Sequence, residues 1–300
     1  MKALQCVELG GPEKLQVNEI DAPEVVPGHV VIEVKSGSIN FPDVLMIQGL
    51  YQFQPPLPFI PGGESAGVIS EVGEGVTKFK EGDKVFAMTG VGAFAEKILA
   101  AESNCMPIPE SMDFDSAAAL SMTYGTSLYA LKQRASLQPG ETLLVLGASG
   151  GVGLAAIELG KAMGAKVIAA ASTQDKIDMC LSHGADEGFI YPSSNLDRDQ
   201  QKELSNKIKE LTGGLGPNVI YDPVGGSYAE PCLRSIAWEG RYLVIGFAAG
   251  ADQIPKMPLN LTLLKGCQIV GVFWGAWVGQ FPDENKKNFD ELFNLHSEGK

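Results

Sequence analysis

The stretch ETLLVLGASGGVGLAAIELGKAMGAKVIAAAST, residues 141–173, decides the fold of this chain. It begins with an apolar run at 142–146 and passes through a glycine-rich turn that ends at Gly153. Residues 152–163 then place apolar side chains at helical spacing, and a second apolar run follows at 166–171. This order of strand, tight turn, helix and strand predicts a βαβ unit.

The glycines of the turn indicate a ligand. A side chain there would keep the backbone away from a pyrophosphate, which binds to the unpaired N–H groups at the start of the following helix. We therefore predict that the turn binds a dinucleotide through Gly150, Gly151, Val152 and Gly153. The alternative is a glycine-rich turn that binds nothing, and the strands and helix around this one argue against it.

Strands and helices keep alternating beyond this unit. Four further strands are expected, at 187–191, 218–222, 241–247 and 267–274. Helices are expected at 175–183, 196–211, 227–236 and 281–300. With the two strands of the βαβ unit this makes six strands, the number in a complete doubly wound dinucleotide-binding fold.

The first 100 residues have a different character. Short alternating runs, interrupted by Gly and Pro, lie at 15–17, 30–34, 67–72 and 84–88. Such a pattern is typical of a small β-barrel. A short helix is expected at 40–48, and the proline-rich loop 51–61 could line a pocket. A new helical pattern begins at 111–120, and the domain boundary is expected just beyond it.

The overall composition limits the possible partners. The 300 residues allow two domains, and a hydrophobic content of 45% with 20% charged residues is ordinary for a globular protein. The 23 Lys and Arg residues and 36 Asp and Glu residues give a formal net charge of −13, which disfavours nucleic acid and anionic membranes as partners. No apolar run approaches the ~20 residues that span a bilayer, and the first residues lack the apolar core of a signal peptide. We therefore expect a cytoplasmic protein.

The cysteines and histidines do not form a metal-binding pattern. The five cysteines are scattered and never paired as C-x-x-C, so we predict reduced thiols. The three histidines are far apart in sequence, and none stands in a cysteine cluster. A zinc site is therefore disfavoured.

Five segments carry a resemblance to a known family. They are NFPDVLMIQGLY at 40–51, PGGESAG at 61–67, MTYGT at 122–126, ASGGVG at 148–153 and WEGRYLVIGF at 238–247. Together they resemble the medium-chain dehydrogenase/reductase superfamily and, within it, the quinone oxidoreductase group. The segments are spread over nearly the whole chain.

The resemblance implies an α/β fold in two parts. A GroES-like, β-rich catalytic domain is expected at 1–122, and a doubly wound, six-stranded Rossmann domain at 123–275. Residues 276–300 are expected to return to the first domain. Similar proteins continue through a further strand and helix, so we expect the first domain to be incomplete at the C-terminus. Pairing of strand 267–274 with its mate implies a homodimer.

The chain departs from the zinc alcohol dehydrogenases of this superfamily at the metal-binding positions. Asn40 opens the motif that a cysteine opens there, and Gly63 replaces a histidine. The third ligand position, near Met122 and Thr123, has no cysteine, and the structural zinc lobe has no counterpart at 84–109. The resemblance therefore implies metal-free chemistry. Quinones and α,β-unsaturated carbonyls suit it because they contain their own electron sink.

Several polar residues of both domains acquire candidate roles from the resemblance. Asn40 and Thr126 match positions near the nicotinamide end of the cofactor, although Asn40 could instead cap the following helix. Tyr51 matches a tyrosine that donates a proton or contacts substrate in related enoyl-thioester reductases, and its alternative is packing. Asp43 and Glu64 are expected to be structural hydrogen-bonding groups rather than acids.

Four aromatic residues are assigned to the cofactor site in the same way. Tyr191 resembles a tyrosine that stacks near the adenosine, and packing at the sheet edge is its alternative. Phe273 and Trp274 could form a wall of the nicotinamide pocket, or belong to the core as aromatic residues on apolar strands commonly do. Phe247, the last residue of its motif, is assigned to the cofactor site by the resemblance.

The end of the second strand predicts the choice of cofactor. An NAD site usually has an acidic residue there, which binds the ribose hydroxyls. Here the sequence at 170–173 is AAST, without a carboxylate, and Asp175 belongs to the first turn of the next helix. Ser172 and Lys176 instead offer a hydroxyl and an ammonium group, which predicts NADPH. The alternative for Lys176 is a solvated helix lysine.

Three functions remain open from the sequence. The leading interpretation is an NADPH:quinone oxidoreductase-like enzyme that transfers hydride to a quinone or enone. The second is an enoyl-thioester reductase, which is weakened because no Lys or Arg at 44–76 could bind a coenzyme phosphate. The third is a protein that binds NADPH without turnover.

Overall fold

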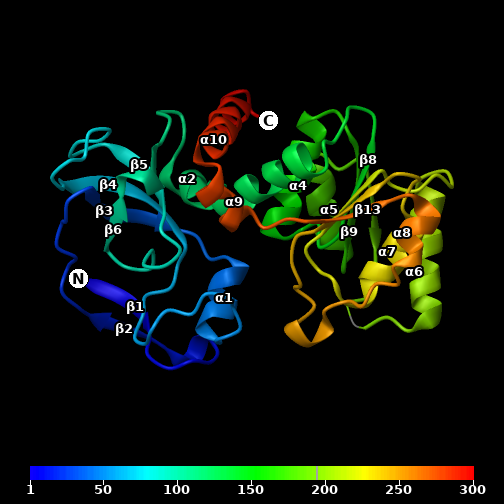
Figure 1. Ribbon diagram of the computed structural model, residues 1–300, viewed down its shortest axis with the longest axis horizontal. Coiled ribbons are helices and arrows are strands. Elements are labelled where there is room, and N and C mark those ends of the chain that lie inside the picture. The colour runs from blue at the N-terminus through cyan, green and yellow to red at the C-terminus, as the bar shows by residue number, and fades with distance from the viewer. Residues whose placement is uncertain (194) are drawn as a thin grey trace. The chain divides into compact units, whose positions relative to one another are not determined.

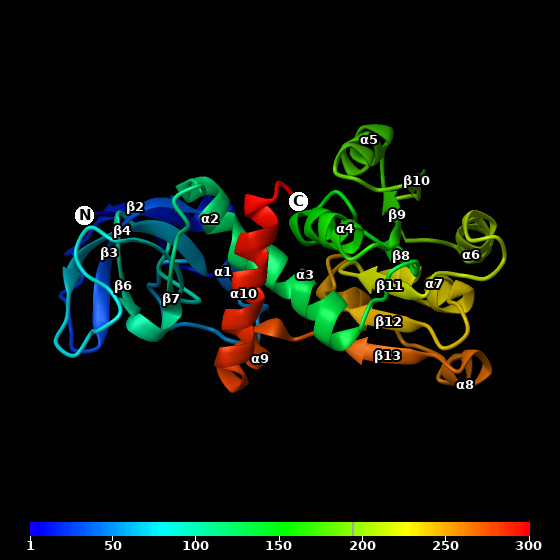
Figure 2. The same ribbon diagram turned by 90° about the horizontal axis from the view of Figure 1, so that it is seen from above.

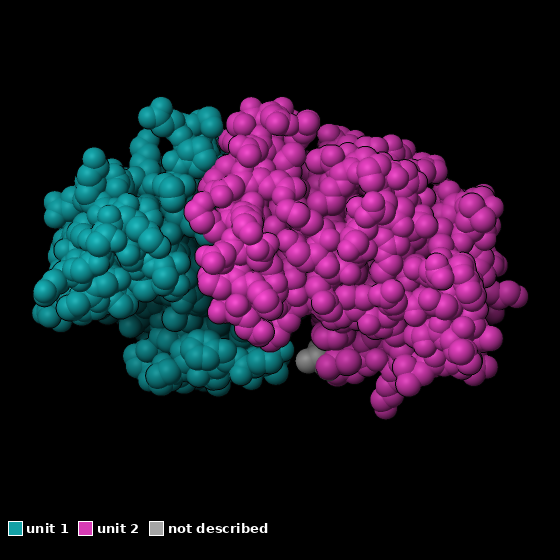
Figure 3. Space-filling view, turned by 45° about the horizontal axis from the view of Figure 1, so that its top comes forward, with its two compact units in different colours: residues 1–122 teal, residues 123–300 magenta. Residues whose placement is uncertain are grey.

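The computed structural model of the protein describes residues 1–193 and 195–300 (Figures 1 and 2). The chain folds as two compact units, Met1–Met122 and Thr123–Lys300, which Figure 3 colours separately. Each unit contains a sheet of its own. Compactness alone assigns no role to either unit, so the domains at 1–122, 123–275 and 276–300 stay predictions.

The second unit is built on a six-stranded parallel sheet. Its strands are β8 (Thr142–Val145), β9 (Lys166–Ala171), β10 (Glu187–Ile190), β11 (Val219–Asp222), β12 (Arg241–Val244) and β13 (Gln268–Gly271). They lie in the order β10-β9-β8-β11-β12-β13, as the labels in Figure 2 show. The predicted six-stranded doubly wound fold is confirmed. The strand order reverses at β8, which is where such folds bind ligands.

Helices cover both faces of this sheet. They are α4 (Gly151–Ala162), α5 (Gln174–Ser182), α6 (Arg198–Leu211), α7 (Ala229–Ser235) and α8 (Asn260–Lys265). Side chains of α6, α7 and α8 share one core cluster with Leu144, Ile168 and Ile220 of the sheet. Gly160 of α4 lies against Leu143, which points to the other face because side chains alternate along a strand. The helix α8 was not expected from the sequence.

Two predicted strands end earlier than expected. The strand expected at 241–247 ends at Val244, because the next two N–H groups turn to the carbonyl of Asp222. The strand expected at 267–274 ends at Gly271, because Trp274 starts α9 (Trp274–Gln280), where its ring packs against Gly125. In both cases contacts far apart in sequence outweigh the local apolar pattern.

The C-terminal segment packs within the second unit. After α9 the chain forms α10 (Pro282–Ser297), whose Asn288 accepts a hydrogen bond from Gln133. Gln133 belongs to the helical residues 121–134, which comprise the π-helices Ser121–Gly125 and Tyr129–Arg134 and, between them, α3 (Thr126–Leu128). The expected return of 276–300 to the first domain stays a prediction.

The first unit is an antiparallel β structure. Its main sheet has the order β6-β3-β4-β5-β7 and consists of β3 (His29–Gly37), β4 (Glu64–Val72), β5 (Lys84–Met88), β6 (Lys97–Ala101) and β7 (Cys105–Pro107). A hairpin of β1 (Lys2–Cys6) and β2 (Leu15–Glu19) and the helices α1 (Phe41–Ile47) and α2 (Phe114–Leu120) complete it. This sheet confirms the GroES-like, β-rich part of the prediction. The strands β1, β6 and β7 were not expected.

The cysteines and the lengths of the helices can also be compared with the predictions. All five cysteines are buried free thiols, as predicted. Among the described helices, none is both long enough and apolar enough to span a membrane.

An ion pair links the amino ends of β8 and β12 in the second unit. Arg241 at the start of β12 binds both carboxylate oxygens of Glu141, at 2.7 and 2.6 Å, and donates from Nε to the carbonyl of Ala135 at 2.9 Å. The two charged side chains are only 14% and 19% exposed. Burial raises the pKa of Glu141, but hydrogen bonds from Arg241 and from the N–H of Gln138 outweigh it and hold this pKa below its ordinary value.

Replacing Arg241 with Met should lower the free energy of unfolding at pH 7 by about 2 kcal/mol, because a half-buried carboxylate loses charge-assisted bonds. Since the folded-state pKa of Glu141 is depressed, this contribution is present above the unfolded pKa of about 4.5 and is lost as the pH falls through the folded value. Wild type and variant should therefore converge in calorimetric scans at acid pH.

The matched control is Arg234→Met, which removes an exposed pair with Glu230 and should change stability by less than about 0.5 kcal/mol. If the deficit of Arg241→Met stays constant down to the lowest pH, the pair with Glu141 is not its cause.

Candidate functional site

The glycine turn follows β8 at the reversal of strand order. Gly147 has a positive φ of 56°, and its carbonyl accepts from the N–H of Gly150 at 2.9 Å. A Cβ on Gly153 would lie 2.6 Å from that same carbonyl oxygen and 2.7 Å from the carbonyl oxygen of Ala148. A Cβ on Gly151 would lie 2.9 Å from the Thr123 side chain. The turn can therefore close only with glycine at these positions.

The start of α4 leaves backbone donors open. No side chain caps the helix at Gly150. Among the described residues, the N–H groups of Gly151, Val152 and Gly153 have no acceptor. Unpaired N–H groups at the positive end of a helix bind anions. The turn thus has the features that a pyrophosphate requires.

Tyr191 supports the turn from behind. Its hydroxyl accepts from the N–H of Gly147 at 3.1 Å, and its side chain is 7% exposed. Its ring lies 4.8 Å from the ring of Tyr228, at a tilt of 55°. Burial raises the pKa of Tyr191 to about 12, so the hydroxyl stays neutral. The structure shows Tyr191 in a packing role, and its contact with adenosine stays a prediction.

Ser172 and Lys176 lie together at the end of β9. Lys176 Nζ donates to Ser172 Oγ at 3.1 Å, and both residues are at least partly exposed. Between them Thr173 caps α5 by accepting from the N–H of Lys176. The strand end therefore presents an ammonium group and a hydroxyl together, as the sequence predicted.

The remaining aromatic candidates lie in different surroundings. Phe247 is half-buried, and its ring would be 3.0 Å from a Cβ on Gly225. Trp274 is buried, and a Cβ on Gly125 would lie 2.6 Å from its ring, so Trp274 adjoins the segment that contains Thr126. Phe273 is 61% exposed. The cofactor contacts of these three aromatic residues and of Thr126 stay predictions.

Asp222 lies at the carboxyl edge of the sheet, where such folds bind ligands, and was not predicted from the sequence. It ends β11, is buried, and accepts from the N–H groups of Val224 and Gly225 at 2.7 and 2.9 Å and from the hydroxyl of Tyr242. Burial raises its pKa above the ordinary value. Asp222 thereby shapes the loop after β11. The available signal was an acid that ends an apolar strand just before Pro223.

A buried carboxylate organises the candidate residues of the first unit. Glu64, the first residue of β4, is 1% exposed. Its Oε1 accepts from the Ser38 hydroxyl and from Asn40 Nδ2 at 2.6 Å, and its Oε2 accepts from the Ser121 hydroxyl and from the N–H of Met122 at 2.8 Å. Four donors thus surround one carboxylate. We call this set the Glu64 network.

The Glu64 network fixes the orientation of the Asn40 amide. A carboxylate only accepts hydrogen bonds, so the NH₂ group of Asn40 must face Glu64. The same NH₂ group donates to Ser38 Oγ at 2.9 Å. Both amide hydrogens are therefore in use, and only the carbonyl oxygen Oδ1 keeps acceptor capacity for a ligand. The backbone N–H of Asn40 donates to the Asp43 carboxylate at 2.8 Å at the start of α1.

Asp43 and Tyr51 lie near one another in this unit. Asp43 is buried and accepts from the N–H groups of Asn40 at 2.8 Å and Gly62 at 3.2 Å, and burial raises its pKa. Tyr51 is half-buried against the apolar cluster that includes Met46, and its hydroxyl has no hydrogen-bond partner within the described chain. Burial and then the charge of Asp43 raise the pKa of Tyr51, so the phenol keeps its proton.

In residues 1–193 and 195–300 there is no group of three or more His, Cys, Asp or Glu side chains that could hold a metal ion.

Comparison with known proteins agrees with this architecture. Residues 26–110 match the family model of the alcohol dehydrogenase GroES-like domain, and residues 151–293 match that of the zinc-binding dehydrogenases. Quinone oxidoreductase-like protein 2 homolog from Nematostella vectensis is 38% identical over 301 residues, which cover 100% of this chain and 79% of that protein.

Two solved structures are similar over the full length. Escherichia coli quinone oxidoreductase complexed with NADPH has 30% identity and a TM-score of 0.88, and the match covers 100% of this chain and 89% of that one. The CurK enoyl reductase has 26% identity and a TM-score of 0.85, with the same coverage. From the relatives and the fold together, the chain belongs to the quinone oxidoreductase group of the medium-chain dehydrogenase/reductase superfamily.

Proposed function

We propose that the protein is an NADPH-dependent reductase that transfers hydride to quinones or other α,β-unsaturated carbonyls without a metal. The observation that carries the proposal is the combination of an open glycine turn with a Ser172–Lys176 pair at the end of the next strand. The turn fits a pyrophosphate, and the pair fits a 2′-phosphate, which needs a cation and a donor. The E. coli relative was solved with NADPH, which supports this assignment.

The residues of this chain have separate tasks in the reaction. The N–H groups of Gly151, Val152 and Gly153 hold the pyrophosphate, and Lys176 neutralises the 2′-phosphate. NADPH supplies the hydride when it is bound. Asn40 can only accept a hydrogen bond, so its Oδ1 suits the carboxamide NH₂ of a nicotinamide and cannot donate to a substrate carbonyl. Asn40 is therefore proposed to orient the ring.

Tyr51 is proposed to provide the proton. Reduction of an enone or quinone creates negative charge on oxygen, and a neutral phenol can donate to it. The raised pKa keeps Tyr51 protonated through neutral pH, and its hydroxyl has no other partner in the described chain. Asp43, whose charge helps to raise that pKa, accepts backbone N–H groups and serves as a structural residue.

The alternatives differ in substrate and in turnover. CurK is an enoyl reductase, which keeps an enoyl thioester as the second candidate substrate class. A coenzyme or carrier phosphate would need cations, and residues 44–76 contain none. A protein that binds NADPH without turnover is the third candidate.

Cytoplasmic location stays a prediction.

The homodimer is proposed to form through 267–274. Strand β13 is an edge strand of its sheet, so its outer backbone groups can pair with a second copy. Sedimentation velocity of the full chain tests this, and a monomer at all accessible concentrations would refute it.

One activity panel tests the proposed function. The purified protein should oxidise NADPH rapidly when a quinone or an alkenal is the acceptor, and much more slowly with an enoyl thioester. The loss of nicotinamide absorbance measures the rate. The rate should survive exhaustive chelation, since the proposal places no metal in the reaction. Loss of activity on chelation that added zinc restores would overturn the metal-free mechanism. Tight NADPH binding without turnover of any acceptor would select the non-catalytic alternative.

Replacing Lys176 with Ala should weaken NADPH binding by about ten- to a hundredfold, because a charge-assisted contact to the 2′-phosphate contributes roughly 1.5–3 kcal/mol. Binding of NADH, which lacks that phosphate, should hardly change. Titration of both cofactors measures the effect, and Lys176→Arg is the control that should keep most of the affinity. An equal loss of affinity for NADH and NADPH would mean that Lys176 does not bind the 2′-phosphate.

Replacing Tyr51 with Phe should lower kcat by about a hundredfold, the lower range for loss of a general acid, while leaving the Kd of NADPH unchanged. Stopped-flow single turnovers with a quinone and an enone measure it. Tyr129→Phe, a buried tyrosine stacked on Trp277, is the control expected to keep kcat. An undiminished kcat in the Tyr51 variant would leave Tyr51 with its packing role.

A further inference from the structure

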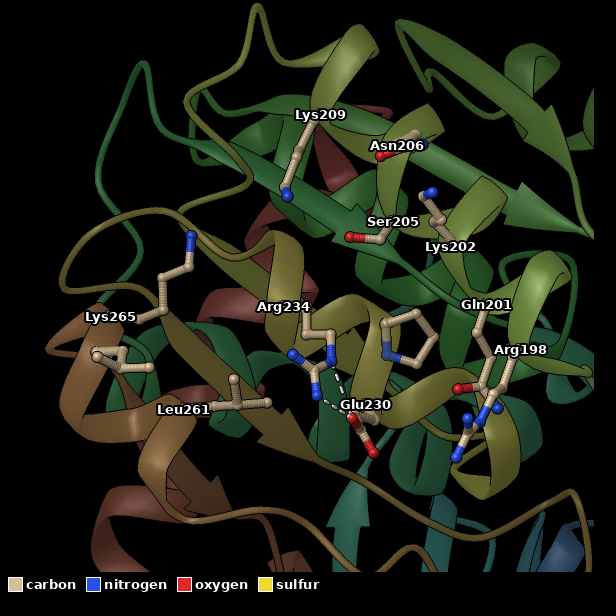
Figure 4. Close-up of a pocket in the computed structure, with 12 residues that line it drawn as sticks. Arg198, Gln201, Lys202, Ser205, Asn206, Lys209, Glu230, Arg234, Leu261 and Lys265 are labelled. Atoms are coloured by element: carbon tan, nitrogen blue, oxygen red, sulfur yellow. Dashed lines mark hydrogen bonds and ion pairs between the residues drawn. The ribbon is translucent and has the colours of Figure 1, made fainter.

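Residues of helices α6, α7 and α8 line a hollow that the proposed reaction does not use. It has a volume of about 710 Å³, and Figure 4 shows the residues that line it. That size falls within the range of small-molecule sites. None of the glycine turn, Ser172 or Lys176 lines it.

The walls of the hollow are strongly basic. Five cations line it, and in Figure 4 they surround one space: Arg198, Lys202, Lys209, Arg234 and Lys265. The only carboxylate among the lining residues is Glu230, and it is already paired with Arg234. In a protein with a formal net charge of −13, this concentration of positive charge is the reverse of the overall balance. It favours an anionic ligand.

Helix stability does not account for the whole cluster. Lys209, Arg234 and Lys265 lie in the last turns of their helices, where a cation favours the dipole. Arg198 is the first residue of α6, where the dipole disfavours a cation. Among the described residues, neither Arg198 nor Lys202 has a carboxylate partner. The dipole therefore explains three of the cations and leaves two unexplained.

A serine hydroxyl and an apolar surface complete the hollow. Ser205 is only 7% exposed, and its hydroxyl has no hydrogen-bond partner in the described chain. Its oxygen points into the space between the helices (Figure 4). The hydroxyl oxygen itself is accessible to solvent, so it can donate a hydrogen bond to a ligand oxygen that enters the hollow. Pro231, Leu261 and Leu264 supply apolar lining beside it.

From this arrangement we propose that the hollow between α6, α7 and α8 is a binding site for a small organic phosphate, separate from the dinucleotide site. The cations bind the phosphate, Ser205 donates to one of its oxygens, and the apolar side chains contact the organic part. The proposal is independent of the proposed reductase activity, because no residue of the glycine turn takes part.

Calorimetric titration of the full chain with 1-naphthyl phosphate tests the site, with inorganic phosphate and 1-naphthol as the comparison probes. We expect 1-naphthyl phosphate to bind more tightly than either, with and without saturating NADPH. The affinity should fall as salt rises, because exposed charges are screened. No detectable binding at millimolar probe, binding of 1-naphthol as tight as that of its phosphate, or competition with NADPH would each overturn the proposal.

Variants on one helix locate the site. Lys202→Met with Lys209→Met should weaken 1-naphthyl phosphate by about tenfold, and Ser205→Ala by several-fold. The matched control is Lys207→Met, on the same helix, where the lysine pairs with Glu210 and does not line the hollow. Methionine and alanine both have high helix propensity, so none of these variants should fall below the wild-type melting temperature. An equal loss in Lys207→Met would show nonspecific attraction to the helix and refute the site.

Discussion

The second unit depends on the absence of a side chain at Gly153. The carbonyl oxygens of Gly147 and Ala148 occupy the place where a Cβ would stand, so the chain can pass from β8 into α4 only along this path. That path directs the first N–H groups of α4 away from any partner in the described chain. The hydroxyl of Tyr191 holds the turn from the opposite side through the N–H of Gly147. The close backbone packing at Gly153 is therefore also the reason why the first N–H groups of α4 stay open for a ligand.

A second constraint governs the first unit, and it is electrostatic. Glu64 is buried and has no salt bridge within residues 1–193 and 195–300, and four hydrogen-bond donors surround its carboxyl group instead. Losing any one of them would leave part of a buried carboxylate unsatisfied, which costs about 1–3 kcal/mol. The orientation of Asn40 is therefore tied to the stability of the unit, and a ligand finds that amide already aligned.

The sequence predicted those features that depend on residues close together along the chain. Buried parallel strands are continuous apolar runs, which made β8 to β13 visible, and Ser172 and Lys176 are four residues apart around one cap. The short strands β6 and β7 stayed hidden, because distant partners define them: His29 pairs with Ala101, and Val85 with Pro107. The Glu64 network could not be predicted, since Ser121 lies 57 residues from Glu64 along the chain.

The position of Ser121 in the Glu64 network has a mechanical consequence. Ser121 and Met122 are the last residues of the first unit and belong to a π-helical segment, an irregular turn that often occurs at functional positions. Both donate to the carboxylate that also receives the Asn40 amide. The helix that leads out of the first unit is thus anchored at its point of departure. Torsion of that helix about its own axis would pull on Glu64 and reach Asn40 through a chain of only two hydrogen bonds.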